Sequence, residues 1–244
     1  MNTRWRLISP MAASGFNQMA IDEWLLEQHR LGVGLPCLRF YSWQPVAISL
    51  GYHQHRYPHS WDSLRWDGQD IDIVRRPSGG RAVLHQGDLT YALVSSPLSG
   101  RRRETYKYLC EFLIEGWRDL GIHLSLGGEN RRYHRSVNCF SASTAADLVM
   151  EDGYKLIGSA QLYRDGCVLQ HGSMRLCPEP DLVKAVFGDS IYPPSALKKI
   201  KPADLVMVLI AAAKRVFEIE FELQPLSPQE ISQACSWSMA RSKV

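Results

Sequence analysis

A pair of glycines between β-branched runs constrains the fold of this 244-residue chain most strongly. Residues 70–91 read DIDIVRRPSGGRAVLHQGDLTY, and the apolar residues around the Pro-Ser-Gly-Gly break predict three short strands. Consecutive glycines permit positive φ and leave no Cβ between the backbone and a ligand. Arg75, Arg76 and Arg81 add guanidinium groups. The loop suits a ligand with an anionic or strongly polar head, unless it is a plain hairpin turn with solvated arginines.

Composition favours one α/β or α+β domain over residues 1–244, with a helical C-terminal segment at 179–244. The chain is 45% hydrophobic, enough for a sizeable core, and its net charge of +3 indicates neither a nucleic-acid protein nor a membrane-surface protein. The longest apolar run, Leu205 to Ala213, is too short to span a bilayer, and no signal peptide is visible. We therefore expect a cytoplasmic protein.

The six cysteines are scattered without a C-x-x-C pair, which fits a reduced compartment better than a disulfide framework or a zinc site. They are Cys37, Cys110, Cys139, Cys167, Cys177 and Cys235. His53, His55 and His59 lie close together, but no carboxylate or thiolate follows at ligand spacing. We therefore predict no metal site.

Apolar spacing predicts helices over residues 17–31, 105–120, 202–217 and 227–236. In the first of these helices, Asn17 is a candidate cap, and Ala20, Trp24 and Leu31 share one face. Strands are expected at 38–41 and 46–50. Between residues 147 and 174, Asp152-Gly153 and Asp165-Gly166 are hairpin signals.

The segment that follows the central stretch holds the candidate catalytic residues. Cys139 lies in a polar loop of small residues, whereas Cys110, Cys167 and Cys235 fall in helical or strand patterns where burial is the norm. Lys155 begins a predicted strand, and a nearby amine would lower the pKa of a thiol. Small residues at 158–160 weaken that strand and are typical of a place where a ligand chain crosses a sheet.

Several motifs in order resemble the biotin/lipoate-protein ligase and lipoyl/octanoyltransferase superfamily. They are NQMAIDEWLL, LRFYSWQPVAISLGYHQ, RRPSGGRAVLH followed by LTY, YKLIGSAQ and VLQHGS, which cover most of residues 17–173. The resemblance implies a mixed β-sheet flanked by helices, with an acyl tunnel beside the glycine pair and the lysine near the acyl carbonyl. The substrate-binding residues that it implies are Arg76, Ser78, Gly79, Gly80, Arg81, His85, Gly158, Ser159, Ala160, His171 and Gly172.

Because Cys139 precedes Lys155, the chain resembles the octanoyltransferase branch of this superfamily. That branch moves an octanoyl group from acyl carrier protein, without a cofactor, to a lysine of a lipoyl-domain protein (the glycine cleavage H protein or a 2-oxoacid dehydrogenase E2), through a cysteine thioester. Two positions depart from the family pattern: Ser78 stands where the family has Thr, and residues 141–144 differ from the usual Pro-containing run.

Three other readings stay open. The chain could be an ATP-dependent lipoate ligase, a lipoyl amidotransferase or a non-catalytic acyl-binding module. Two arginine clusters, at 101–103 and at positions 131, 132 and 135, are either solvated surface or a docking site for acidic partners such as carrier proteins and lipoyl domains.

Overall fold

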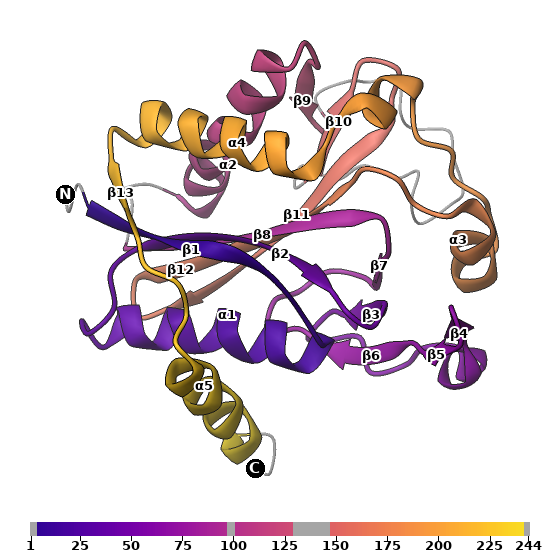
Figure 1. Cartoon of the computed structure of the whole chain (residues 1–244), viewed down its shortest axis with the longest axis horizontal. Helices are drawn as coiled ribbons and strands as arrows, with labels where there is room; N and C mark the ends of the chain where they lie inside the picture. The colour runs from indigo at the N-terminus through magenta and orange to yellow at the C-terminus, as the bar shows by residue number, and fades with distance from the viewer. Residues whose placement is uncertain (1–3, 97–100, 129–146, 242–244) are drawn as a thin grey trace.

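The computed structural model describes residues 4–96, 101–128 and 147–241, and its centre is an eight-stranded mixed sheet (Figure 1). The strand order is β13-β1-β2-β8-β12-β11-β10-β9. The strand β1 runs parallel to both β13 and β2, and the other neighbours are antiparallel. In chain order the strands are β1 (Arg4–Ala13), β2 (Cys37–Trp43), β8 (Asp88–Ser95), β9 (Leu124–Leu126), β10 (Asp147–Met150), β11 (Lys155–Arg164), β12 (Cys167–Arg175) and β13 (Glu220–Leu223).

A second, three-stranded sheet carries the glycine loop, residues 76–82 between β6 and β7. Its order is β6 (Asp72–Arg75), β3 (Ala47–Leu50) and β7 (Val83–His85), with β3 parallel to β6 and antiparallel to β7. The segment between β6 and β7 therefore passes from one outer strand to the other across β3, and the interpretation as a plain hairpin turn is wrong. A short hairpin of β4 (Arg65–Trp66) and β5 (Gln69–Asp70) and the 3₁₀ turn η1 (His59–Ser63) precede β6.

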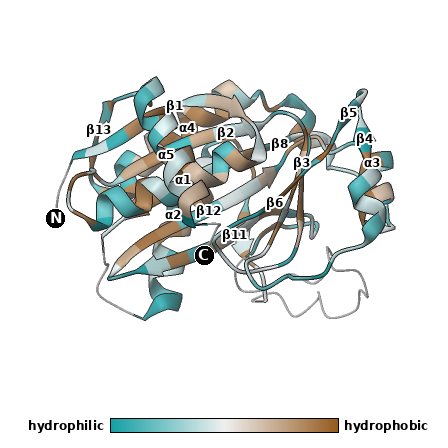
Figure 2. Cartoon of the chain, turned by 90° about the horizontal axis from the view of Figure 1, so that it is seen from below, coloured by the Kyte–Doolittle hydropathy of each residue, from teal (hydrophilic) through white to brown (hydrophobic). Residues whose placement is uncertain are grey.

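Helices cover both faces of the main sheet. One face packs against α2 (Arg102–Asp119) and α4 (Pro202–Phe217), and the other against α1 (Gly15–Arg30), which lies beside α5 (Pro228–Arg241) (Figure 2). The short helix α3 (Pro180–Phe187) and the 3₁₀ turn η3 (Ser195–Lys199) lie between β12 and α4. This arrangement confirms the predicted fold class. Within the part of the chain that the structure describes, no helix is long and apolar enough to span a membrane.

The first helix begins earlier than its sequence pattern indicated. Ser14 is the N-cap, and its hydroxyl accepts a hydrogen bond from the Asn17 amide at 3.4 Å, so the prediction of Asn17 as cap is wrong. At the other end, Leu31 is 58% exposed and lies outside the buried face. The helix also buries three polar residues, Gln18, Asp22 and His29, which the apolar pattern did not single out.

The sequence analysis missed the short strands β4, β5 and β9, and also β1 and β13, which pair across the two ends of the chain. Residues 4–7 of β1 pair with residues 220–223 of β13, more than two hundred positions away, and β13 lies inside the segment expected to be helical. Residues 4–7 read Arg-Trp-Arg-Leu and residues 220–223 read Glu-Phe-Glu-Leu, so each stretch alternates polar and apolar residues, but over only four positions. These strands are stabilised by their long-range pairing.

Candidate active site

A pocket of about 920 Å³ lies where the small sheet and the glycine loop meet the main sheet. Across β11, β12, β8 and β2, the residues Gly158, Ser173, Thr90 and Tyr41 stand opposite one another, and all four line the pocket. They form one row across the sheet, because cross-strand partners share a face. The opposite wall comes from Ser49, the glycine loop and β7.

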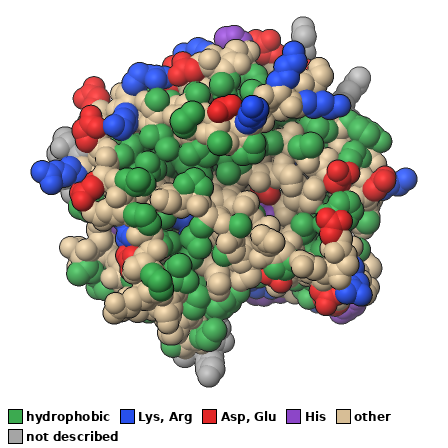
Figure 3. Space-filling model, viewed as in Figure 1, with side chains coloured by type: hydrophobic (Ala, Val, Ile, Leu, Met, Phe, Trp, Pro, Cys, Tyr) green, Lys and Arg blue, Asp and Glu red, His purple; other side chains and the backbone are tan. Residues whose placement is uncertain are grey.

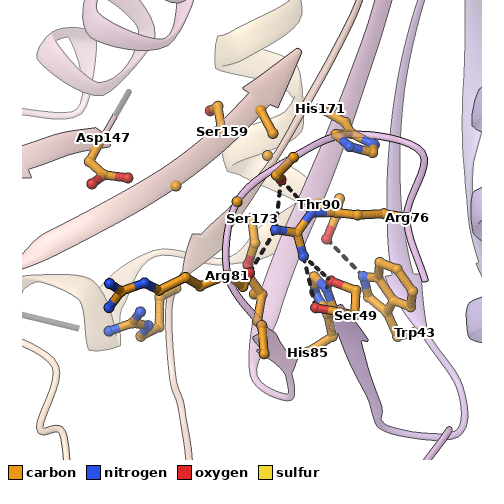
Figure 4. A pocket seen from close by; sticks show the side chains of 18 of the residues that line it. Trp43, Ser49, Arg76, Arg81, His85, Thr90, Asp147, Ser159, His171 and Ser173 are labelled. Atoms are coloured by element: carbon orange, nitrogen blue, oxygen red, sulfur yellow. Dashed lines mark hydrogen bonds between the residues drawn. The ribbon is translucent and has the colours of Figure 1, made fainter. Parts of the chain in front are cut away.

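Most of the predicted site residues meet in this pocket (Figure 4). Those that line it are Arg76, Gly79, Gly80, Arg81, His85, Lys155, Gly158, Ser159, Ala160, His171 and Gly172. Ser78 is buried behind the wall, and Cys139 lies outside the described residues.

Lys155 begins β11 and forms an ion pair across the hairpin. Its Nζ lies 2.8 Å from Oδ1 of Asp147, which starts β10 and is opposite Gly158 in the ladder. The Asp147 side chain is 5% exposed and the Lys155 side chain 21%. The Lys155 ammonium is therefore held on the pocket wall. Sequence analysis missed Asp147, although counting back from the Asp152-Gly153 turn would have placed it opposite this strand.

Arg76 is a structural clamp of the glycine loop. Its guanidinium donates to the carbonyls of Ser49 at 2.8 Å, Gly79 at 2.9 Å and Arg81 at 2.6 Å (Figure 4). Burial lowers its pKa to about 10. Arg76 is thus far from being a solvated arginine, and its hydrogen bonds are directed at the protein's own backbone.

The glycine loop needs its glycines for two different reasons. Gly80 has a φ of +99°, which favours glycine. A Cβ on Gly51, at the end of β3, would lie 1.9 Å from the Gly80 carbonyl oxygen, so a third glycine permits close packing of the loop. Sequence analysis did not single out Gly51. Its place directly after a buried strand was the available signal.

Both ring nitrogens of His85 have hydrogen-bond partners, and its ring stacks on an indole. Its Nε2 lies 2.8 Å from Ser49 Oγ, its Nδ1 lies 2.8 Å from Asp88 Oδ2, and its ring stacks on Trp43 at 3.8 Å. Burial lowers its pKa, and the negative charge of Asp88 opposes that shift. The Asp88 carboxylate also accepts a hydrogen bond from Ser173 at 2.6 Å.

His171 has the same kind of surroundings on the other side of the loop. Its Nε2 lies 2.5 Å from Ser78 Oγ and its Nδ1 lies 2.9 Å from Asp22 Oδ2. Both ring nitrogens therefore have protein partners, as in His85. The two histidines form pocket walls through their rings.

Apolar side chains line much of the rest of the pocket, beside the polar residues Gln54, Gln161 and Arg175. Met19, Trp43, Val83, Trp61 and Phe187 contribute side chains from five separate elements or loops. The indole of Trp43 is fixed by a 2.8 Å hydrogen bond to Thr90. Such a lining suits an aliphatic group. On the face of the molecule seen in Figure 3, most charged side chains lie toward the outer edge, whereas the middle holds hydrophobic side chains together with backbone and other uncharged side chains.

None of the five described cysteines lines the pocket. Burial raises the pKa of Cys37 to about 12 and that of Cys110 to about 11, which disfavours their thiolates. Among the described residues there is no group of three His, Cys, Asp or Glu side chains that could hold a metal ion.

The mixed sheet thus holds a lysine and a glycine loop on the walls of one partly apolar pocket, an arrangement that can enclose an aliphatic chain with its polar end beside a cation. Residues 14–237 match the Lipoyl protein ligase A/B catalytic domain, and the chain belongs to this family. The resemblance inferred from the sequence motifs is thereby confirmed.

Two relatives illustrate the similarity in sequence. Octanoyltransferase LipM of Symbiobacterium thermophilum is 39% identical over 185 residues, which cover 72% of this chain and 66% of the relative. Octanoyltransferase LipM of Moorella thermoacetica is 39% identical over 189 residues, which cover 75% of this chain and 68% of the relative. The chain thus spans about two thirds of the length of these curated relatives.

Solved structures show the same fold. The bi-partite lipoate protein ligase of Thermoplasma acidophilum is 19% identical, with a TM-score of 0.73 and coverage of 99% of this chain and 93% of that one. A lipoate-protein ligase A bound with ATP is 20% identical, with a TM-score of 0.75 and coverage of 99% and 95%.

Proposed function

We propose that this chain is an octanoyltransferase that moves an octanoyl group from acyl carrier protein to a lysine of a lipoyl-domain protein. The observation that carries the proposal is its 39% identity, over about 70% of its length, to proteins called Octanoyltransferase LipM. The lipoyl-domain acceptor would be the glycine cleavage H protein or a 2-oxoacid dehydrogenase E2.

The pocket supports this proposal chemically. An octanoyl group is aliphatic with one polar end, and the pocket has apolar side chains together with one ammonium group, that of Lys155. A cation beside the carbonyl carbon stabilises the negative charge that develops on the oxygen during acyl transfer. The same cation favours a neighbouring thiolate over a thiol.

We assign the nucleophile to Cys139, which precedes Lys155 in the chain as in the octanoyltransferase branch. The Cys139 thiolate attacks the carbonyl carbon of the donor thioester, the carbon–sulfur bond to the carrier protein breaks, and the carrier leaves as a thiolate that takes a proton from solvent, so that an octanoyl thioester remains on Cys139. The acceptor amine then attacks that carbonyl, loses a proton and forms an amide, and the Cys139 thiolate leaves. A thiolate both attacks and leaves readily, so this sequence needs no nucleotide.

Intact mass measurement tests the proposal. After incubation with octanoyl-carrier protein and no nucleotide, the protein should gain one octanoyl group, which neutral hydroxylamine removes. Cys139→Ser should lose turnover, because a hydroxyl is a poor nucleophile at neutral pH. The matched control is Cys177→Ser, which removes an exposed thiol that does not line the pocket.

The opposite result would identify a ligase. If the protein modifies a lipoyl domain only when ATP and free octanoate or lipoate are supplied, and Cys139→Ala does so equally well, the acyl-enzyme proposal is wrong.

A further inference from the structure

A buried carboxylate on α1 connects the helix to the main sheet. Asp22 is completely buried and accepts hydrogen bonds from Arg39 Nη1 at 3.0 Å, Tyr41 Oη at 2.8 Å and His171 Nδ1 at 2.9 Å. A buried carboxylate is costly unless donors surround it, and here the donors come from β2 and β12. Asp22 therefore has a defined place over the sheet.

The sheet register explains how one side chain reaches both strands. Arg39, Ala92 and His171 stand opposite one another on β2, β8 and β12. The central member of this row is alanine, whose methyl group leaves room for Asp22 between its two larger neighbours. The row thus forms a recess that accommodates the carboxylate of Asp22.

The donors around Asp22 fix the tautomer of His171. A carboxylate only accepts, so Nδ1 of a neutral His171 carries the proton, and its Nε2 must accept from Ser78. Tyr41 also donates to this carboxylate, because burial and then the charge of Asp22 raise its pKa well above its usual value and keep its hydroxyl protonated. The hydrogen bonds therefore run from Ser78 to His171 to Asp22.

Ser78 is the residue directly before the glycine pair. It is 1% exposed, its Oγ lies 2.5 Å from His171 Nε2, and its carbonyl accepts from the Tyr52 amide at 2.8 Å. Gly79 and Gly80 have no side chains with which to anchor themselves. Ser78 is thus the point at which the loop is fastened to the main sheet.

We propose that Asp22 and His171 are positioning residues, which hold the glycine loop in its pocket-lining conformation through the Ser78 hydroxyl. For its activity readout this inference rests on the proposed octanoyl transfer. Its structural readout, amide hydrogen exchange of residues 76–82, requires no activity.

The first test compares three serine variants by hydrogen exchange and urea unfolding. Ser78→Ala should speed exchange of the loop amides about tenfold, because a buried hydrogen bond that fastens a loop is worth about that factor in local opening. Ser78→Thr keeps the hydroxyl and should restore exchange to within about twofold of wild type. The matched control is Ser95→Ala, which removes a buried serine hydroxyl bonded to the Ser96 carbonyl at 3.1 Å and should leave the loop unchanged.

The second test uses His171→Asn, whose amide nitrogen can still donate to Asp22 but cannot reach Ser78. It should loosen the loop as much as Ser78→Ala does, and the double variant should be no looser than either single variant, since both remove one contact. The same variants should raise the KM for octanoyl-carrier protein more than they lower kcat.

Two results would overturn the inference: loop exchange unchanged in Ser78→Ala, or independent, additive effects in the double variant. Faster loop exchange without any octanoyl transfer in the wild type would instead refute the proposed function and leave the positioning role intact.

Discussion

The ion pair between Lys155 and Asp147 allows the contribution of Lys155 to stability to be separated from its contribution to octanoyl transfer. Exposed ion pairs contribute about 0.2–1 kcal/mol, and breaking a buried pair costs about 3–5 kcal/mol. With Asp147 buried and Lys155 21% exposed, this pair lies between the two cases. We expect Lys155→Met, which keeps the aliphatic stem, to lower the free energy of unfolding by about 1–2 kcal/mol.

For a domain of this size, that loss corresponds to a fall of about 2–4 °C in Tm. Adding Asp147→Asn to Lys155→Met removes the carboxylate charge that lost its ammonium, so most of the stability should return. Transfer should not return. If Lys155 stabilises the developing oxyanion, both variants lose roughly 10²–10³-fold in kcat, the usual effect of deleting such a donor.

The assay is a double-mutant cycle of Lys155→Met and Asp147→Asn, followed by urea unfolding and by single-turnover octanoyl transfer. A coupling energy of about 1–2 kcal/mol in stability, with no recovery of rate, is the expected result. A coupling energy near zero would refute the structural role of the pair. Wild-type transfer by either Lys155 variant would remove Lys155 from the chemistry.

Three further predictions concern the loop, the pH dependence and the partner. Gly51→Ala should cost about 1–3 kcal/mol in urea unfolding, because its Cβ would lie 1.9 Å from the Gly80 carbonyl, whereas Gly79→Ala, with no atom within 4 Å, should cost little. Burial lowers the pKa of His85, so the unfolded chain takes up the proton first and stability should fall as the pH drops below about 6.5; His85→Gln should flatten that fall. Replacing Arg101, Arg102 and Arg103 by Gln should weaken the salt dependence of transfer from carrier protein, since ~0.1 M salt screens exposed charges over about 10 Å; unchanged salt dependence would return the cluster to solvated surface.

Local signals were sufficient for much of the fold. The helix predicted over residues 202–217 has those bounds in α4, because a proline at the first helical position and an apolar stripe are both local. Both Asp-Gly turns are present, with positive φ at Gly153, Asp165 and Gly166. The strands β1 and β13 were missed because the alternation in each covers only four residues, and the pairing between them joins opposite ends of the chain.

The candidate site divides in the same way. Motifs predicted the pocket wall, since glycines, a lysine at a strand start and small strand residues are visible in the sequence. They did not predict the carboxylates Asp22, Asp88 and Asp147, because a buried acid is recognised only when strand register shows its donors. Before the register is known, each looks like a surface residue.

The buried carboxylates of Asp22 and Asp88 explain how a glycine-rich loop can form a rigid wall of the pocket. A backbone without side chains can approach a ligand closely, but it loses more conformational entropy than any other when it becomes ordered. Two series of hydrogen bonds, one on each side of the loop, offset this entropy cost. One series runs from Asp88 through His85 and Ser49 to Arg76. The other runs from Asp22 through His171 to Ser78. Each connection ends on a buried acid held by the main sheet, so the position of the loop is tied to the strands that form the pocket floor. A substitution deep in the sheet should therefore change the pocket as much as one in the loop itself.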